Sequence, residues 1–101
     1  MRKKKILVHG TLESISNFFS DAVSRDYEVV ALLSEQLEKI SVSRDGKELE
    51  VFASQSLPKF IYGLIDGIIF TDGIDKESAV NFFGNRGLEP RKIILWDAAQ
   101  G

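Results

Sequence analysis

The stretch Lys4-Lys5-Ile6-Leu7-Val8-His9-Gly10-Thr11-Leu12-Glu13-Ser14 decides the fold of this chain. Residues 6–9 form an almost uninterrupted apolar run, Gly10 interrupts it, and Thr11 is a good N-cap residue for a helix. Apolar side chains then recur at helical spacing, at Leu12, Ile15, Phe18, Phe19, Ala22 and Val23. This order of strand, tight turn and helix is typical of the first unit of a doubly wound α/β sheet.

The rest of the chain continues this alternation of helices and strands. After a first helix over 12–25, the pattern predicts strands at 27–33, 48–53, 65–71 and 93–96. A short helix capped by Ser56, with Pro58 in its first turn, precedes the fourth strand, and its one apolar face is expected to consist of Leu57, Phe60, Ile61 and Leu64. A helix from the cap Asp75 to about Arg86 precedes the fifth strand. Gly87 is a natural residue to end that last helix. Residues 38–53 leave two interpretations open: a single edge strand, or a hairpin of 38–43 against 47–53.

Composition and length describe one domain, residues 1–101. The hydrophobic content of 44% and charged content of 28% are those of a soluble globular chain, and the net charge of −2 favours neither nucleic acid nor a membrane surface. No apolar run reaches membrane-spanning length, and without cysteine the sequence fits the cytoplasm. The sequence ends five residues after Trp96, where such a sheet usually has a covering helix. We therefore expect an N-terminal part of a longer natural chain.

Five segments carry a resemblance to a known group of domains: residues 5–10 (KILVHG), 28–33 (EVVALL), 46–52 (GKELEVF), 65–70 (IDGIIF) and 87–94 (GLEPRKII). In this succession the chain resembles the small Rossmann-like module at the N-terminus of several bacterial polysaccharide-modifying proteins. These include sugar-nucleotide dehydratases and epimerases, acetyltransferases of sugar pathways, and FkbM-type methyltransferases. The resemblance implies an α/β, three-layer Rossmann-like fold with a five-stranded, mostly parallel sheet in the strand order 3-2-1-4-5.

A nucleotide site in such a fold would lie at the loops after strands one, two and four. The candidate cofactor-binding residues there are Gly10, Thr11, Ser14, Glu35 and Thr71. The helix start after Gly10 could hold a phosphate through its N–H groups and the Ser14 hydroxyl, and Glu35 follows the second strand where a ribose-binding acid is expected.

The first turn departs from the dinucleotide fingerprint G-x-G-x-x-G, because Leu12 and Ile15 replace the second and third glycines. Glu13 adds a negative charge beside any phosphate, which costs roughly 1 kcal/mol at about 4 Å in water. We therefore expect NAD to bind more weakly than about 1 mM. The alternative stays open that this is a plain turn whose helix start is satisfied by Thr11 and Glu13 themselves.

His9, Ser14 and Asp72 can be drawn as a hydrolytic triad, but no nucleophile-elbow pattern supports one. We interpret His9 as a packed, hydrogen-bonded side chain. One imidazole and no thiol predict no metal site, and no catalytic residue is predicted.

Three functions follow as hypotheses. The first is a non-catalytic Rossmann-like module of a sugar- or polysaccharide-modifying protein that packs against a downstream domain or a second copy, with no cofactor of its own. The second is a domain that binds NAD or a sugar nucleotide, and the third is a stand-alone flavodoxin-like regulatory domain. For the first, we expect an apolar surface near the fifth strand, contributed by Trp96, Phe82 and Leu88.

Overall fold

The computed structural model describes residues 3–35, 41–44, 46–71 and 75–96 of the chain. Its strands are β1 (Lys4–His9), β2 (Tyr27–Leu33), β3 (Ser41–Arg44), β4 (Lys47–Phe52), β5 (Gly67–Phe70) and β6 (Ile93–Leu95). Two α-helices, α1 (Leu12–Ser20) and α2 (Lys76–Gly84), connect them together with four 3₁₀ turns: η1 (Ala22–Asp26), η2 (Ser54–Ser56), η3 (Lys59–Gly63) and η4 (Pro90–Lys92).

The strands form one sheet in the order β3-β4-β2-β1-β5-β6. The pairs β4–β2, β2–β1, β1–β5 and β5–β6 are all parallel. Numbered by their order among the parallel strands, these five stand as 3-2-1-4-5, so the predicted Rossmann-like sheet is confirmed. The order reverses at β1, and in this architecture the point of reversal marks the crevice where ligands bind.

The open question at residues 38–53 is settled in favour of the hairpin for the residues that are described. β3 pairs antiparallel with β4, with Ser41 opposite Glu50 and Arg44 opposite Lys47. Gly46 takes a φ of +78°, a left-handed conformation that glycine adopts without strain. On β4, Leu49 and Val51 are buried while the alternating glutamates face solvent, as the period of two predicts. The hairpin adds a sixth strand at the edge beside β4.

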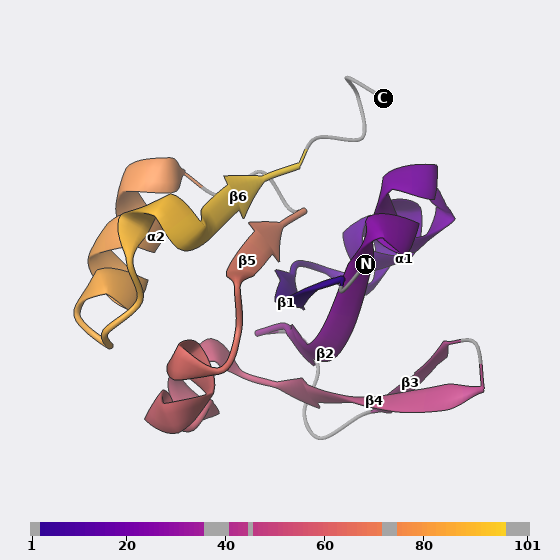
Figure 1. Cartoon of the computed structure of the whole chain (residues 1–101), viewed down its shortest axis with the longest axis horizontal. Helices are drawn as coiled ribbons and strands as arrows, with labels where there is room; N and C mark the ends of the chain where they lie inside the picture. Colours follow the sequence, from indigo (N-terminus) through magenta and orange to yellow (C-terminus); the bar gives the residue numbers. More distant parts are fainter. Residues whose placement is uncertain (1–2, 36–40, 45, 72–74, 97–101) are drawn as a thin grey trace.

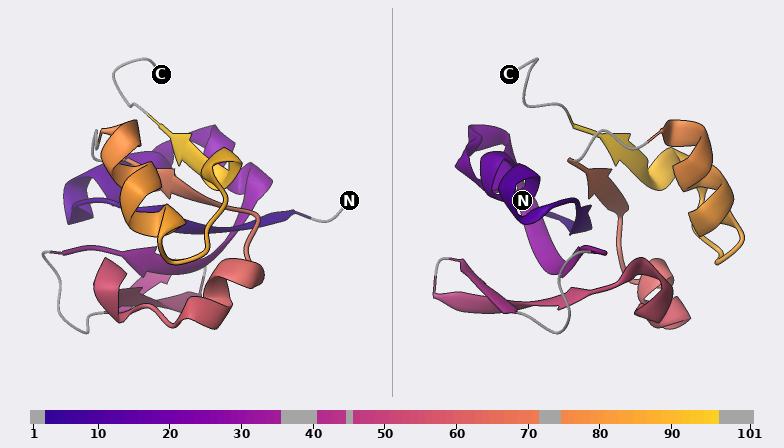
Figure 2. Two further views of the ribbon diagram at one scale, coloured as in Figure 1. Left: turned by 90° about the vertical axis from the view of Figure 1, so that its left-hand side faces the viewer. Right: turned by 180° about the vertical axis from the view of Figure 1, so that it is seen from behind.

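The sheet is covered on both faces, which gives three layers (Figures 1 and 2). Helix α1 lies on one face, where Ile15 and Phe18 pack on Ile6 and Val8 of β1. Helix α2 and η3 lie on the other face, over a core that includes Leu7, Leu33, Tyr62, Phe70 and Phe83. Because side chains alternate along β1, its residues supply both cores, and the strand is buried from Ile6 onward.

The first predicted helix is shorter than expected. It was expected to reach Arg25, but α1 ends at Ser20, since Asp21 adopts an extended conformation. The Ser24 hydroxyl then donates to the Asp21 carbonyl at 2.8 Å, which is the local side-chain competition that makes serine a poor helix-interior residue. The chain continues as η1 directly into β2.

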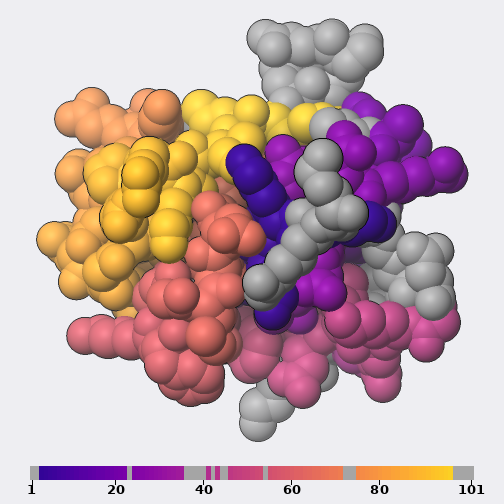
Figure 3. All heavy atoms as spheres, viewed as in Figure 1, coloured from indigo at the N-terminus to yellow at the C-terminus, as the bar shows by residue number. Residues whose placement is uncertain are grey.

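The predicted helix capped by Ser56 is wrong. Ser56 ends η2, and after Pro58 the chain forms only the five-residue 3₁₀ turn η3, with no side-chain cap. A proline disfavours the α conformation in the residue before it, which agrees with the break at Leu57 between η2 and η3. The tighter winding also changes the buried face: Tyr62 is 3% exposed, whereas Phe60 and Leu64, expected on the apolar face, are 70% and 65% exposed. Figure 3 shows the η3 region at the lower left of the molecular surface.

The last helix, α2, ends at Gly84, two residues before the predicted Arg86, but the predicted role of Gly87 in ending it is confirmed. Gly87 has a φ of +96°, its N–H donates to the Gly84 carbonyl, and the Leu88 N–H donates to the Phe83 carbonyl. This is the Schellman pattern of a helix end. It turns Leu88 into the core at 3% exposure, so the expected contribution of Leu88 to an apolar surface is wrong. Trp96 is only partly buried, and its ring packs edge-on against the Phe18 ring with 5.3 Å between the ring centroids. Phe82 is 39% exposed.

Candidate functional site

The candidate site is the carboxyl edge of the sheet, where β1, β2 and β5 end side by side. The hydrogen-bond ladder extends one residue past each strand: the Gly10 N–H donates to the Leu33 carbonyl and the Thr71 N–H to the His9 carbonyl. These bonds fix the backbones of Gly10, Thr71 and Leu33 relative to one another. The residues predicted from the loops after strands one, two and four therefore come from neighbouring strand ends.

The start of α1 is closed by a reciprocal cap between Thr11 and Ser14. The Ser14 N–H donates to Thr11 Oγ1 at 3.1 Å, and the Thr11 N–H donates to Ser14 Oγ at 2.9 Å. The alternative expectation that the helix start satisfies itself is right about Thr11, but the second partner is Ser14 and not Glu13. The Ser14 side chain, considered above as a phosphate ligand, is thus part of a capping box.

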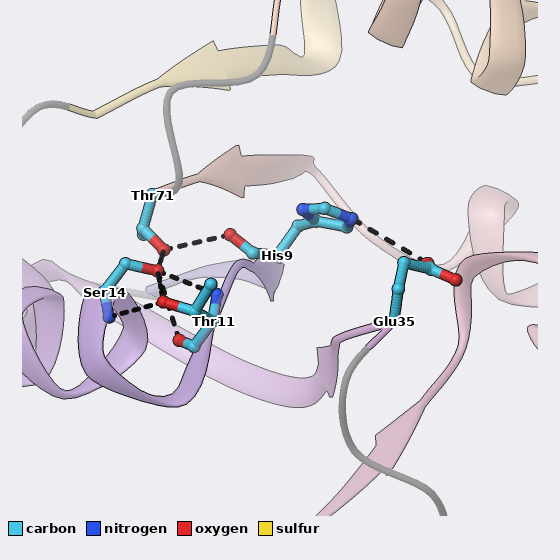
Figure 4. A network of polar contacts seen from close by, with 5 residues as sticks. All are labelled: His9, Thr11, Ser14, Glu35 and Thr71. Atoms are coloured by element: carbon cyan, nitrogen blue, oxygen red, sulfur yellow. Dashed lines mark hydrogen bonds and ion pairs between the residues drawn. The ribbon is translucent and has the colours of Figure 1, made fainter.

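Thr71 joins this cap from the end of β5 (Figure 4). Its hydroxyl lies 2.8 Å from Ser14 Oγ and 3.0 Å from the His9 carbonyl, and the residue is 8% exposed. We call the three side chains of Thr11, Ser14 and Thr71 the hydroxyl cluster. It connects the first turn of α1 to β5 across the end of β1.

The hydroxyl cluster lies directly over Gly10. A Cβ atom built on Gly10 would be 2.2 Å from Thr71 Oγ1 and 2.4 Å from Ser14 Oγ, far inside contact distance. Glycine is therefore required here by the protein's own side chains. Among the described residues, no acceptor faces two N–H groups of the first turn, those of Leu12 and Glu13. The Glu13 side chain is exposed beside them.

His9 and Glu35 form the other half of the edge. His9 Nε2 lies 4.0 Å from Glu35 Oε1, and the imidazole packs on the Phe70 ring at 5.0 Å between centroids. Figure 4 shows the imidazole pointing away from the hydroxyl cluster and toward Glu35. The His9 side chain is 8% exposed and that of Glu35 is 54% exposed, so the carboxylate is accessible while the imidazole is a buried support. The expected role of His9 as a packed side chain agrees with this placement.

The structure thus separates the predicted site into two groups. Gly10, Thr11, Ser14 and Thr71 are brought together around the start of α1, and Glu35 pairs with His9 instead. The hydrolytic triad has no support from the described residues, because the imidazole turns away from Ser14; its third member, Asp72, lies outside them. Sequence reasoning missed both the Thr71–Ser14 contact and the His9–Glu35 pair, because each joins residues from different strand ends. Side chains alternate between the two faces along β1, which places His9 on the same face as Leu7, and this alternation was the one sequence feature that indicated the direction of its side chain.

Among the residues that the structure describes, no group of three or more His, Cys, Asp and Glu side chains is placed to hold a metal ion. Within the same residues, no helix is long and apolar enough to cross a membrane.

Comparison with known proteins identifies the fold and no family. No protein-family model matches the sequence, and no curated protein matches it. Among solved structures, the chain is similar to aspartate semialdehyde dehydrogenase II from Vibrio cholerae in complex with ASA, with a TM-score of 0.64 and 14% identity over 95% of this chain. A second structure of aspartate semialdehyde dehydrogenase II from the same organism gives a TM-score of 0.63, also at 14% identity. The chain spans 31% and 28% of the lengths of these two proteins.

Proposed function

We propose that the chain is a nucleotide-binding domain of Rossmann type within a larger protein, and that it holds the nucleoside part of NAD or of a sugar nucleotide. The observation that carries this proposal is the position of Glu35. Its accessible carboxylate lies two residues past the end of β2, the strand that pairs with β1 in the sheet. In nucleotide-binding Rossmann domains an acid at this place accepts hydrogen bonds from ribose hydroxyls.

The structural neighbours support the same class of ligand. Both are dehydrogenases by name, and hydride transfer generally requires a nicotinamide or flavin cofactor that a protein domain must bind. At 14% identity these neighbours support the fold of this chain, but they do not identify which of its residues form a site. The choice of Glu35 therefore rests on this chain's own geometry.

The phosphates of such a ligand gain little at the first turn of α1. A helix N-terminus stabilises an anion by roughly 0.3–1 kcal/mol at an exposed site, and the Glu13 charge opposes this by a similar amount. NAD is therefore expected to bind with a dissociation constant above about 1 mM, with its affinity coming from the ribose contact.

Calorimetric titration of the 101-residue chain with NAD and with a UDP-sugar tests the proposal. Glu35→Gln should weaken binding roughly tenfold or more, because a hydrogen bond to a charged acceptor contributes about 1.5–3 kcal/mol. Glu28→Gln is the matched control, since Glu28 is exposed near the opposite end of the same strand, opposite Lys5. No heat of binding with ligand raised to about 10 mM, roughly ten times that limit, or equal losses in both variants, would reject the proposal.

A second candidate is a packing module of a sugar- or polysaccharide-modifying protein, which joins a downstream domain or a second copy of the chain. The exposure of Phe60 in η3 and of Leu64 at its C-cap favours it, because two large apolar side chains four residues apart are open to solvent there. Sedimentation of the chain and of a Phe60→Ser/Leu64→Ser variant tests it. Association that the double substitution abolishes supports the packing role, and a monomer in both samples argues against self-association.

A further inference from the structure

His9 is a buried polar side chain that the proposed function does not use. It is the only histidine of the chain and the last residue of β1, and its side chain is 8% exposed. Burying a polar ring costs free energy unless its nitrogen atoms find partners. An apolar side chain could fill the same place against the Phe70 ring without that cost, so the imidazole indicates a role for its nitrogen atoms beyond packing.

The backbone of His9 is fixed from both sides. In the sheet it stands opposite Leu33 of β2 and opposite Phe70 of β5. Its carbonyl accepts from the Thr71 N–H at 2.9 Å and from the Thr71 hydroxyl at 3.0 Å. Because the ring also packs on the Phe70 ring, with 5.0 Å between the centroids, the imidazole has little room to change its orientation.

Glu35 meets this ring from the end of β2. The Ser34 N–H donates to the Phe52 carbonyl at 2.9 Å, so the sheet fixes the backbone up to the residue before Glu35. Glu35 Oε1 lies 4.0 Å from His9 Nε2, and Figure 4 shows the two side chains directed toward each other. The Glu35 side chain is 54% exposed, so it has room to rotate until a carboxylate oxygen accepts a hydrogen bond from Nε2.

A carboxylate that is held in advance makes a stronger ribose contact. A glutamate side chain in solvent loses rotamer freedom when a ligand orders it, and this loss is among the largest of any side chain. A carboxylate also has two oxygens, each with two lone pairs, so a bond from Nε2 leaves acceptor positions for ribose hydroxyls. Preorganisation of Glu35 therefore improves affinity without any further contact to the ligand.

We propose that His9 is a positioning residue that holds the Glu35 carboxylate for the ribose through a hydrogen bond donated by Nε2. The inference rests on the proposed function for the ribose contact at Glu35. It adds to that function a residue that touches no ligand and acts only through the carboxylate. The end of β1 thereby contributes to ribose recognition independently of any phosphate contact at the start of α1.

NMR titration of the 101-residue chain with NAD, raised to about 50 mM, tests the proposal. His9→Phe keeps an aromatic ring against Phe70 but has no donor, and it should weaken NAD binding by about three- to tenfold. His9→Gln keeps an N–H donor near the position of Nε2 and should lose less than about twofold. In a Glu35→Ala chain His9→Phe should have no further effect on affinity, because no carboxylate is left to hold. Urea denaturation is the control for folding, and His9→Phe should be no less stable than wild type, because phenylalanine buries no polar atom.

A second measurement needs no ligand. Because the chain has one histidine, the ¹⁵N spectrum of its imidazole has a single Nε2 signal. This signal should move when Glu35→Gln is introduced, and it should stay in place in Glu28→Gln, which changes an exposed acid near the opposite end of β2.

The outcomes separate the two proposals. Unchanged affinity in His9→Phe, a loss that His9→Gln shares in full, or an equal loss in the Glu35→Ala chain overturns the positioning role. If NAD does not bind the wild type, the ribose site at Glu35 is refuted, and the Nε2 signal alone decides about His9. A signal that moves only with Glu35→Gln then supports the hold on the carboxylate, and an unmoved signal overturns it. The same signal decides if His9→Phe does not fold.

Discussion

Replacing Gly10 by alanine tests the central structural claim, that the protein's own hydroxyls occupy the first turn. The new methyl group would lie 2.2 Å from Thr71 Oγ1 and 2.4 Å from Ser14 Oγ, so at least these two groups must move. Overpacking of this kind costs roughly 1–3 kcal/mol. Rotation of the Ser14 hydroxyl also deprives the Thr11 N–H of its acceptor, which adds about 1 kcal/mol. We expect Gly10→Ala to lower the free energy of unfolding by about 2–4 kcal/mol, a large part of the roughly 5–15 kcal/mol of a domain this size.

Urea denaturation followed by circular dichroism measures this loss. Gly84→Ala is the matched control, because a Cβ on Gly84 would meet nothing within 4 Å and the residue is helical; it should stabilise the domain by roughly 0.5–1 kcal/mol. In a Ser14→Ala/Thr71→Ala background the cost of Gly10→Ala should fall to less than half, as coupled neighbours are not additive. A Gly10→Ala variant within about 0.5 kcal/mol of wild type, or an undiminished cost without the hydroxyls, would refute the reasoning.

Three further substitutions have defined outcomes. Thr11→Ala removes the N-cap of α1 and should cost about 1 kcal/mol in urea denaturation, whereas Thr11→Ser should cost less than half of that. Gly87→Ala places a Cβ at a φ of +96° with open space around it, so strain alone should cost about 1–2 kcal/mol, and Gly87→Asn should cost less. Burial raises the pKa of the Tyr62 hydroxyl above its ordinary value of 10.0, and the Arg86 guanidinium opposes this rise. Because the pKa of Tyr62 is higher in the folded state than in the unfolded state, its protonated hydroxyl contributes its full stabilisation below pH 10, and this contribution is lost as the pH rises through the folded-state pKa. In denaturation at several alkaline pH values, the free energy of unfolding should therefore decline less steeply for Tyr62→Phe than for wild type or Tyr27→Phe.

The sequence by itself determined the elements whose causes are local. The apolar run before Gly10, the Thr11 cap and the helical spacing after it predicted β1 and α1, because strand burial and capping depend on residues a few positions apart. Gly87 predicted the end of the α2 segment for the same reason. The strand order 3-2-1-4-5 agrees with the expectation drawn from the resemblance to Rossmann-like modules, in which helices and strands alternate along the chain.

Other local patterns were misleading because weak preferences compete. The apolar spacing of Phe60 and Leu64 suggested a helix face, but Pro58 and a 3₁₀ turn left both exposed. The ambiguous stretch before β4 became a hairpin because β4 offered it an open edge, which no short window of sequence reveals.

Only the tertiary structure decided what the candidate site can hold. From the sequence, Gly10, Ser14 and Thr71 are candidate cofactor-binding residues on loops after different strands, with no contact between them predicted. The pairing of β5 with β1 brings Thr71 to Ser14 over Gly10, and the direction of the His9 side chain gives Glu35 its neighbour. Thr71 is 57 residues after Ser14 in the chain, and Glu35 is 26 residues after His9. Strand order and packing decide which residues meet across such separations, so these contacts cannot be predicted from the spacing of residues along the chain.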